Sequence, residues 1–260
     1  MKKVLIVLGV IALIIVLFLG YIGFIPGISN LFGSNKPRDL GIKYTEADRA
    51  SARGKSKIEY EALPASTAPE NSLVRTGSRA VTTDFSSAEI SALMNDRPYK
   101  FWPYKNVQMK FNADGTAEVS GALIKDRVPS YCASIGIPKA VADKVAYYLP
   151  SNTVYYVKGK ASLKDNKVAI FEPQAFEIGR LRLPVGMFLS KIEITDTALA
   201  LDTTELSADL SKASGKKGLI INYINDHLAS IKGFFAKEAY FSENKLHFDG
   251  NLNEKESTVQ

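Results

Sequence analysis

The chain has 260 residues, of which 46% are hydrophobic and 23% are charged, and its formal net charge is +6. This is an ordinary globular balance, with no sign of a collagen-like, disulfide-rich or globally disordered chain. The positive excess is far smaller than the clustered basic footprint of nucleic-acid-binding proteins, so nucleic acid is not an expected partner. The single cysteine, Cys132, excludes an intrachain disulfide, and we expect a small buried thiol.

The N-terminal segment 4–25, VLIVLGVIALIIVLFLGYIGFI, carries no charge over 22 residues. A membrane-spanning helix needs about 20 apolar residues, so this segment predicts an anchor. Lys2 and Lys3 precede it, and the positive-inside rule then places the N-terminus in the cytoplasm and the bulk of the chain outside. Tyr21 and Phe24 stand where an interfacial aromatic belt would lie. The alternative is a cleaved signal peptide, but the apolar core is too long and no small-x-small cleavage site is apparent.

Composition divides the chain into four regions. A cytoplasmic stub and transmembrane anchor occupy residues 1–25. Pro, Gly, Ser and charged residues dominate 26–80, which predicts a juxtamembrane linker with one short helix. An extracytoplasmic α+β domain is expected over 81–253, and 254–260 is predicted to be a frayed polar tail.

Two short helices are indicated by capping boxes, in which a Ser or Thr stands three residues before an acidic side chain. Thr45 and Asp48 have this spacing, and so do Ser86 and Glu89. We expect one helix to begin at each cap.

Two further helices are predicted later in the chain. Residues 138–149 place a proline in the first turn, where its missing N–H costs nothing. Residues 216–231 give the clearest helical pattern. Their apolar stripe consists of Leu219, Ile220, Tyr223, Ile224, Leu228 and Ile231.

Three antiparallel hairpins are predicted by strict alternation of apolar and polar residues around short turns. They span residues 107–123, 153–171 and 236–252. The remaining predictions are an extended segment at 175–183, a short helical turn at 185–190 and a second extended segment at 192–201.

Glycines recur in the predicted strands. Gly121, Gly159 and Gly250 each follow an apolar residue by two positions. A glycine inside a strand often marks a bulge or a bend, so the repetition favours a strongly curved sheet. The predicted fold is therefore α+β: an N-terminal transmembrane helix, then a strongly curved antiparallel sheet packed with a long amphipathic helix.

Motifs for catalysis are missing from the sequence. His227 and His247 stand in no metal-binding or nucleophile motif, and no Gly-rich phosphate loop occurs. We expect no catalytic residue, no metal and no cofactor, and hence no enzyme. A cell-wall hydrolase is the alternative, because a glycosidase needs only two carboxylates that the fold brings together.

Large aromatic residues are frequent, and three occur as doublets, at 147–148, 155–156 and 234–235. Neighbouring residues on a strand point to opposite faces, so one of each pair on a strand must face outward, into a groove or against another element. The ordinary interpretation is core packing, and the functional one is an apolar groove between the curved sheet and the long helix.

The region 82–252 resembles the bacterial LmeA-like phospholipid-binding domains of the wider tubular lipid-binding (TULIP-like) group. The matching stretches are FSSAEISALMN at 85–95, the hairpin 107–123, AFEIG at 175–179 with Leu183-Pro184, the helix 216–231 and the strand through FDG at 248–250. The resemblance implies a non-enzymatic domain that binds membrane lipid or an acyl chain between a curled sheet and helices. The groove residues expected on this basis are Phe176, Leu183, Phe188, Leu189, Ile220, Tyr223 and Ile224.

The sequence thus predicts a membrane-anchored, extracytoplasmic lipid-binding protein of the bacterial cell envelope. An alternative is a scaffold or regulatory module of an envelope or secretion complex, whose partners would be envelope proteins rather than lipid.

Overall fold

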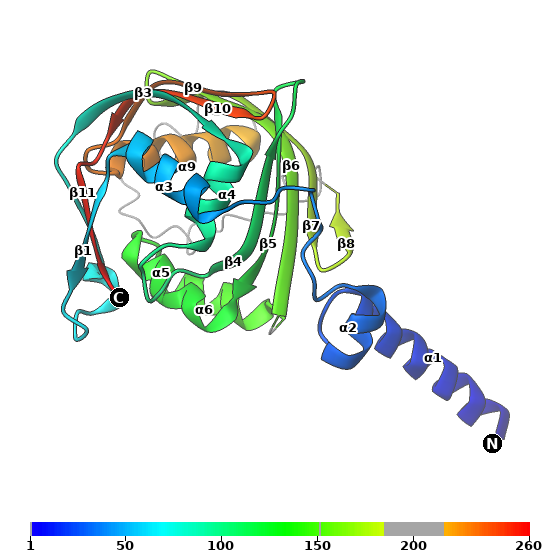
Figure 1. Cartoon of the computed structure of the whole chain (residues 1–260). Coiled ribbons are helices and arrows are strands. Elements are labelled where there is room, and N and C mark those ends of the chain that lie inside the picture. The colour runs from blue at the N-terminus through cyan, green and yellow to red at the C-terminus, as the bar shows by residue number, and fades with distance from the viewer. Residues whose placement is uncertain (1, 151, 185–215) are drawn as a thin grey trace.

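The computed structural model of the chain describes residues 2–150, 152–184 and 216–260. An N-terminal helix protrudes from a compact α+β domain (Figure 1). The helices are α1 (Lys2–Tyr21), α2 (Pro26–Phe32), α3 (Glu46–Ser56), α4 (Ser87–Asn95), α5 (Val128–Ser134), α6 (Lys139–Tyr148) and α9 (Lys216–Ser230), with 3-10 turns η1 (Pro69–Asn71) and η2 (Lys125–Arg127). The strands are β1 (Glu59–Leu63), β2 (Leu73–Thr76), β3 (Arg79–Ser86), β4 (Tyr104–Phe111), β5 (Thr116–Ile124), β6 (Asn152–Lys164), β7 (Lys167–Ile178), β8 (Leu181–Leu183), β9 (Phe235–Ser242), β10 (Lys245–Leu252) and β11 (Lys255–Val259).

The larger sheet is antiparallel throughout and curls into a half-barrel (Figure 1). Its strand order is β3-β10-β9-β6-β5-β4, and β7 and β8 extend it from β6. The ladder shifts register at Gly159 and at Gly250. A Cβ at Gly250 would collide with the carbonyl oxygen of Phe235, and one at Gly159 would lie 2.9 Å from that of Glu172. Both glycines therefore permit the bulges that curve the sheet, as the sequence predicted.

The three predicted hairpins are confirmed as the pairs β4–β5, β6–β7 and β9–β10. Both predicted capping boxes are also confirmed: Thr45 accepts a hydrogen bond from the backbone N–H of Asp48, and Ser86 from that of Glu89. The helices predicted over 138–149 and 216–231 correspond to α6 and α9. The predictions at 185–190 and 192–201 lie outside the described residues.

A second, three-stranded sheet has the order β1-β11-β2, with β11 parallel to β1 and antiparallel to β2. The prediction of a frayed tail at 254–260 is wrong, because β11 is the central strand of this sheet. Its residues Glu256, Thr258 and Val259 are buried. The prediction that 26–80 is a linker with one short helix is likewise corrected, since β1, β2 and the start of β3 belong to the folded domain.

The main core lies where α3 and α4 pack on the β3–β10–β9 part of the large sheet. Its buried members are Ala52, Val81, Phe85, Ala236, Ala239 and Phe248. Ile90 and Leu93 of α4 pack against this cluster, which confirms the apolar face predicted for that helix. Of the predicted aromatic doublets on strands, Phe234 turns toward Phe248 while Phe235 is 44% exposed.

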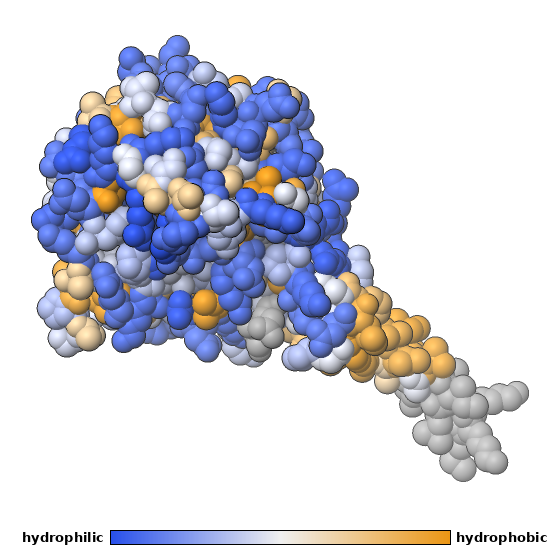
Figure 2. Space-filling view, viewed as in Figure 1, coloured by the Kyte–Doolittle hydropathy of each residue, from blue (hydrophilic) through white to orange (hydrophobic). Residues whose placement is uncertain are grey.

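The apolar N-terminal segment forms a bent pair of helices rather than one straight helix to residue 25. Among the described residues no single helix is long and apolar enough to cross a membrane, but the segments Gly9–Tyr21 and Pro26–Phe32, bent by 72°, meet this requirement together. The bend is held by two buried serines, because Ser29 Oγ and Ser34 Oγ donate to the carbonyl oxygen of Gly20 at 2.9 and 2.7 Å. Figure 2 shows that apolar residues gather on this N-terminal arm, whereas the visible face of the domain is mainly hydrophilic.

Candidate functional site

Of the seven residues predicted for an apolar groove, five lie among the described residues, on β7, β8 and α9. Phe176 of β7 and Leu183 of β8 are cross-strand partners. Ile220, Tyr223 and Ile224 lie on α9, which packs against β7. The other two, Phe188 and Leu189, lie outside the described residues.

One hydrogen bond fastens α9 to the large sheet. The backbone N–H of Val168, at the start of β7, donates to Oδ1 of Asn225 at 2.8 Å. Asn225 comes directly after Ile224, a residue of the apolar stripe of α9. The bond therefore sets the rotation of the helix about its axis. It thereby fixes which face of α9 meets β7.

The apolar groove residues are only partly buried. Phe176, Leu183, Ile220 and Ile224 are all half-buried, and Tyr223 is 37% exposed. Residues of the main core, such as Phe85 and Phe248, are by contrast 5% and 6% exposed. These side chains on α9, β7 and β8 are therefore more accessible than those of the main core.

A cavity of about 360 Å³ opens at the C-terminal end of α9. Its walls come from α9 and the residues after it, from η1 with β2, and from the end of α5. The lining consists of Glu70, Asn71, Leu73, Val74, Arg75, Ser134, Ile135, His227, Ser230, Ile231 and Lys232. The lining is thus mixed, with polar and charged residues beside the apolar Leu73, Val74, Ile135 and Ile231.

The ionisable groups at this cavity differ in whether they are charged and whether they are already paired. Burial, with a smaller effect of Arg75, lowers the pKa of His227, so its imidazole is neutral at pH 7. Arg75 donates through Nε to Glu256 at 3.2 Å. Lys232 adds a second cation and Glu70 one carboxylate. The cavity can thus hold a polar or anionic group next to apolar walls.

Beneath Arg75 lies a buried ion cluster that no sequence motif indicated. Glu256 is 1% exposed and accepts hydrogen bonds from Nη2 of Arg97 at 2.6 and 2.5 Å. The guanidinium of Arg97 also stacks 4.7 Å from the ring centre of Trp102. Burial alone would lower the pKa of Arg97, but Glu256 outweighs it and the net pKa is raised. The carboxylate neutralises one of its two arginine neighbours, so the cluster keeps one positive charge.

Aromatic side chains cluster where α5 packs on β4. Tyr131 of α5 lies with its ring centre 5.5 Å from that of Trp102 and 5.9 Å from that of Tyr104. Burial raises the pKa of Tyr104 and of Tyr131, so both phenols stay neutral at physiological pH. The neighbouring Cys132 is half-buried, and burial raises the pKa of its thiol. A protonated thiol is a poor nucleophile, so this cluster is suited to packing rather than to catalysis.

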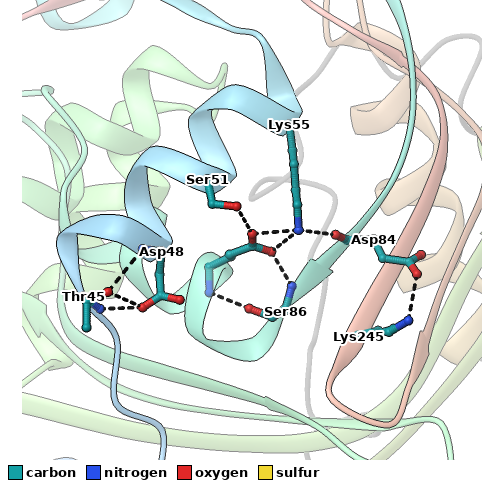
Figure 3. Close-up of polar contacts among 8 residues, drawn as sticks. Thr45, Asp48, Ser51, Lys55, Asp84, Ser86 and Lys245 are labelled. Atoms are coloured by element: carbon teal, nitrogen blue, oxygen red, sulfur yellow. Dashed lines mark hydrogen bonds and ion pairs between the residues drawn. The ribbon is translucent and has the colours of Figure 1, made fainter.

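Ser51 and Lys55 have the spacing of neighbours on one helix face, and both point at the carboxylate of Glu89 (Figure 3). Lys55 Nζ lies 2.7 Å from that carboxylate and donates to the carbonyl oxygen of Asp84 at 2.8 Å. Burial raises the pKa of Glu89, but Lys55 and Ser51 outweigh it, and the net pKa is lowered. Ser51 Oγ donates to Oε1 of Glu89 rather than to Lys55, so the lysine is not placed as a general base for Ser51. The cluster fastens α3 to α4.

A second cavity, of about 630 Å³, lies on the outer face of the large sheet, beneath residues 37–40. Arg38 pairs with the buried Glu177 at 2.6 Å and stacks 4.4 Å from the ring centre of Tyr156. Tyr156 donates in turn to Glu118 at 2.7 Å, and burial together with this bond raises the pKa of Tyr156 to about 12. These groups are therefore paired with one another, and Asp39, Lys110 and Arg180 line the cavity beside them.

Within the described ranges, no group of three or more His, Cys, Asp or Glu side chains is placed to hold a metal ion. Comparison of the chain with family models, curated proteins and solved structures gives no match. The resemblance to tubular lipid-binding domains therefore stays a prediction. Arg75 and Glu256 were not anticipated, because they lie in segments whose composition indicated a linker and a tail, and no motif marked Arg97.

Proposed function

We propose that the chain is a membrane-anchored, extracytoplasmic protein that binds a lipid acyl chain between α9 and the β7–β8 part of its curved sheet, without catalysing a reaction. The observation that supports this proposal is the set of partly buried apolar side chains on α9 and on β7–β8, together with the packing of α9 against β7. Ile220 and Ile224 contribute to it from the helix, and Phe176 and Leu183 from the strands.

The energetics favour exchange rather than permanent capture. Each methylene removed from water contributes about 0.8 kcal/mol, so a groove that covers ten of them would oppose release into water by roughly 8 kcal/mol. An acyl chain inside a bilayer is already shielded from water, and its transfer into an apolar groove is close to neutral. Such a groove therefore exchanges its acyl chain with a membrane, and it retains the chain when the groove is surrounded by water.

The cavity at the C-terminal end of α9 supplies a place for the polar part of the same ligand. Arg75 and Lys232 provide positive charge there, and Leu73 and Ile231 continue the apolar surface. A ligand with an apolar chain and an anionic or polar head matches this order of groups along α9 better than a purely apolar ligand does.

The proposal is tested with the full-length chain in nanodiscs that contain a lipid with a photoactivatable group on its acyl chain. We expect cross-links on residues 216–231 and on β7–β8 in addition to the N-terminal arm. Ile224→Gln should reduce the cross-linking of α9, because it places a polar group in the groove. Ala229→Gln is the matched control, since Ala229 is an exposed residue of the same helix.

Cross-links confined to α1 and α2 would contradict the lipid groove. The anchored scaffold would then be the better hypothesis, and protein cross-linking from the outer face of the membrane would identify its partner.

A further inference from the structure

The two most exposed aromatic side chains among the described residues are neighbours at the C-terminal end of α6. Tyr147 is 77% exposed and Tyr148 65%, and their ring centres lie 5.2 Å apart. Residues 138–149 were predicted to be helical, and the C-terminal end of that helix presents both rings to the outside. Two adjacent tyrosines exposed in this way leave a large apolar area without cover.

The end of α6 lies beside the bend of the N-terminal arm (Figure 1). Pro150, two residues after Tyr148, is so close to the arm that a Cβ at Gly23 would lie 4.0 Å from its Cγ. The turn between β7 and β8 also contacts the arm. There Arg180 Nη2 donates to the carbonyl oxygen of Gly33 at 2.7 Å, and the backbone of Gly179 abuts that of Ile22. The tyrosines are therefore held near the point where the anchor would leave the membrane.

The arm itself also exposes large apolar side chains. Tyr21 is 40% exposed, Phe24 47% and Leu31 82%. We use the name interfacial collar for the set Tyr21, Phe24, Leu31, Tyr147 and Tyr148. Tyrosine is enriched at membrane–water boundaries, because its ring enters the apolar layer while its hydroxyl stays hydrated.

Charge on α6 agrees with the same partner. Lys139 and Lys144 lie on its exposed face, where Lys139 pairs with Asp143 at 2.5 Å and Lys144 has no ion pair within the described part of the chain. A free cation next to exposed tyrosines is typical of segments that meet anionic headgroups.

We propose that the interfacial collar lies in the headgroup layer of the bilayer, so that the domain rests on the membrane through the end of α6. This inference rests on the proposed membrane anchoring and adds the orientation of the domain. Lys139, at the other end of α6, lines a cavity of about 520 Å³ whose apolar walls include Pro129 and Ile137. A helix of this length spans about 15 Å, so the resting position holds that cavity close to the bilayer surface.

The test uses the full-length chain in nanodiscs with part anionic lipid, in a Cys132→Ser background. A nitroxide label is attached in turn to Tyr147→Cys, Tyr148→Cys and Tyr240→Cys. Tyr240 is the control, because it is 40% exposed on β9, at the opposite side of the domain from α6 in Figure 1. Collision with oxygen, which partitions into lipid, is compared with collision with a water-soluble nickel complex.

We expect the labels at 147 and 148 to collide several-fold more with oxygen than with nickel, relative to the label at 240. A second set places the label at Lys144→Cys, where Tyr147→Ser together with Tyr148→Ser should return it to a water-exposed profile. Both tyrosines are exposed, so their replacement leaves the packing of the domain intact.

Equal profiles at 147, 148 and 240 in a chain that still cross-links acyl chains on α9 would overturn this inference alone. A chain that does not enter nanodiscs at all would overturn the anchoring, and this inference with it.

Discussion

Arg97, two residues after the end of α4, binds Glu256 in the last strand of the chain through its Nη2 at 2.6 and 2.5 Å and its Nε at 3.1 Å. The two residues are separated by 159 positions. Glu256 is buried, and Nε of Arg75 on β2 donates to its Oε2 at 3.2 Å, the oxygen that Arg97 Nη2 contacts at 2.5 Å. This single carboxylate therefore links the small sheet to the helical layer over the large one.

Replacement of Glu256 by glutamine is expected to destabilise the fold by about 3 kcal/mol, because removal of one member of a buried ion pair leaves the other without compensation. Two arginines would lose their counter-charge here. Urea denaturation followed by circular dichroism measures the loss. Lys255→Gln, one position away, breaks the exposed pair with Glu61 and should cost less than about 1 kcal/mol. A similar small loss at both positions would contradict the role given to Glu256.

The place of β11 could not be predicted from local sequence. Its parallel partner β1 lies nearly two hundred residues upstream, as the pair Glu59 and Lys255 shows. Neither strand alternates cleanly, and Glu256 suggests an exposed position unless its arginine partners are known. By contrast, the two capping boxes and the three hairpins depend on residues three to twenty-three positions apart, so the sequence indicated them correctly.

Truncation of the chain after Asn253 should open the small sheet while the large sheet persists. β1 and β2 do not pair with each other and are joined only through β11. Hydrogen exchange should therefore rise sharply over 59–63 and 73–76 and change little over β5 and β6. Removal of Gln260 alone is the control, because that residue is exposed and lies beyond the strand. Unchanged protection of β1 in the longer truncation would be inconsistent with this topology.

His227 should make stability fall in mild acid. Burial, and to a smaller extent Arg75, lowers the pKa of this imidazole below its ordinary value of 6.5, so below about pH 6.5 the unfolded chain takes up a proton that the folded chain does not. The free energy of unfolding is therefore unaffected by protonation of His227 above pH 6.5, and it decreases as the pH falls from 6.5 toward the lowered pKa of the folded state. The unfolding free energy at pH 7.5 and pH 5 gives the difference, which His227→Gln should reduce. Asn222→Gln on the same helix should leave it unchanged, and a pH dependence unaffected by His227→Gln would refute the assignment.

The candidate groove was only partly accessible to sequence reasoning. Periodicity identified the apolar face of α9, whereas the single extended segment predicted at 175–183 is divided by a turn at Gly179 into the end of β7 and the short strand β8. Periodicity did not show that the polar end of α9 meets Arg75, because β2 lay in a segment whose Pro, Gly and Ser content indicated a linker. The ladder between Phe176 and Leu183, by contrast, follows from the turn at Gly179, whose φ is +62°.

Membrane attachment and its direction can be tested independently of any ligand. If the bent pair α1–α2 anchors the chain, the full-length protein should stay in the membrane pellet after alkaline carbonate treatment, and a chain that lacks residues 2–25 should not. Asn35→Cys in a Cys132→Ser background should react with a membrane-impermeant maleimide added from outside the cell, because the positive-inside rule places Lys2 and Lys3 in the cytoplasm. A cysteine inserted after Met1 should react only once the membrane is permeabilised. Labelling from outside at the N-terminus, or none at position 35, would reverse the proposed topology and place the groove of α9 and β7–β8 in the cytoplasm.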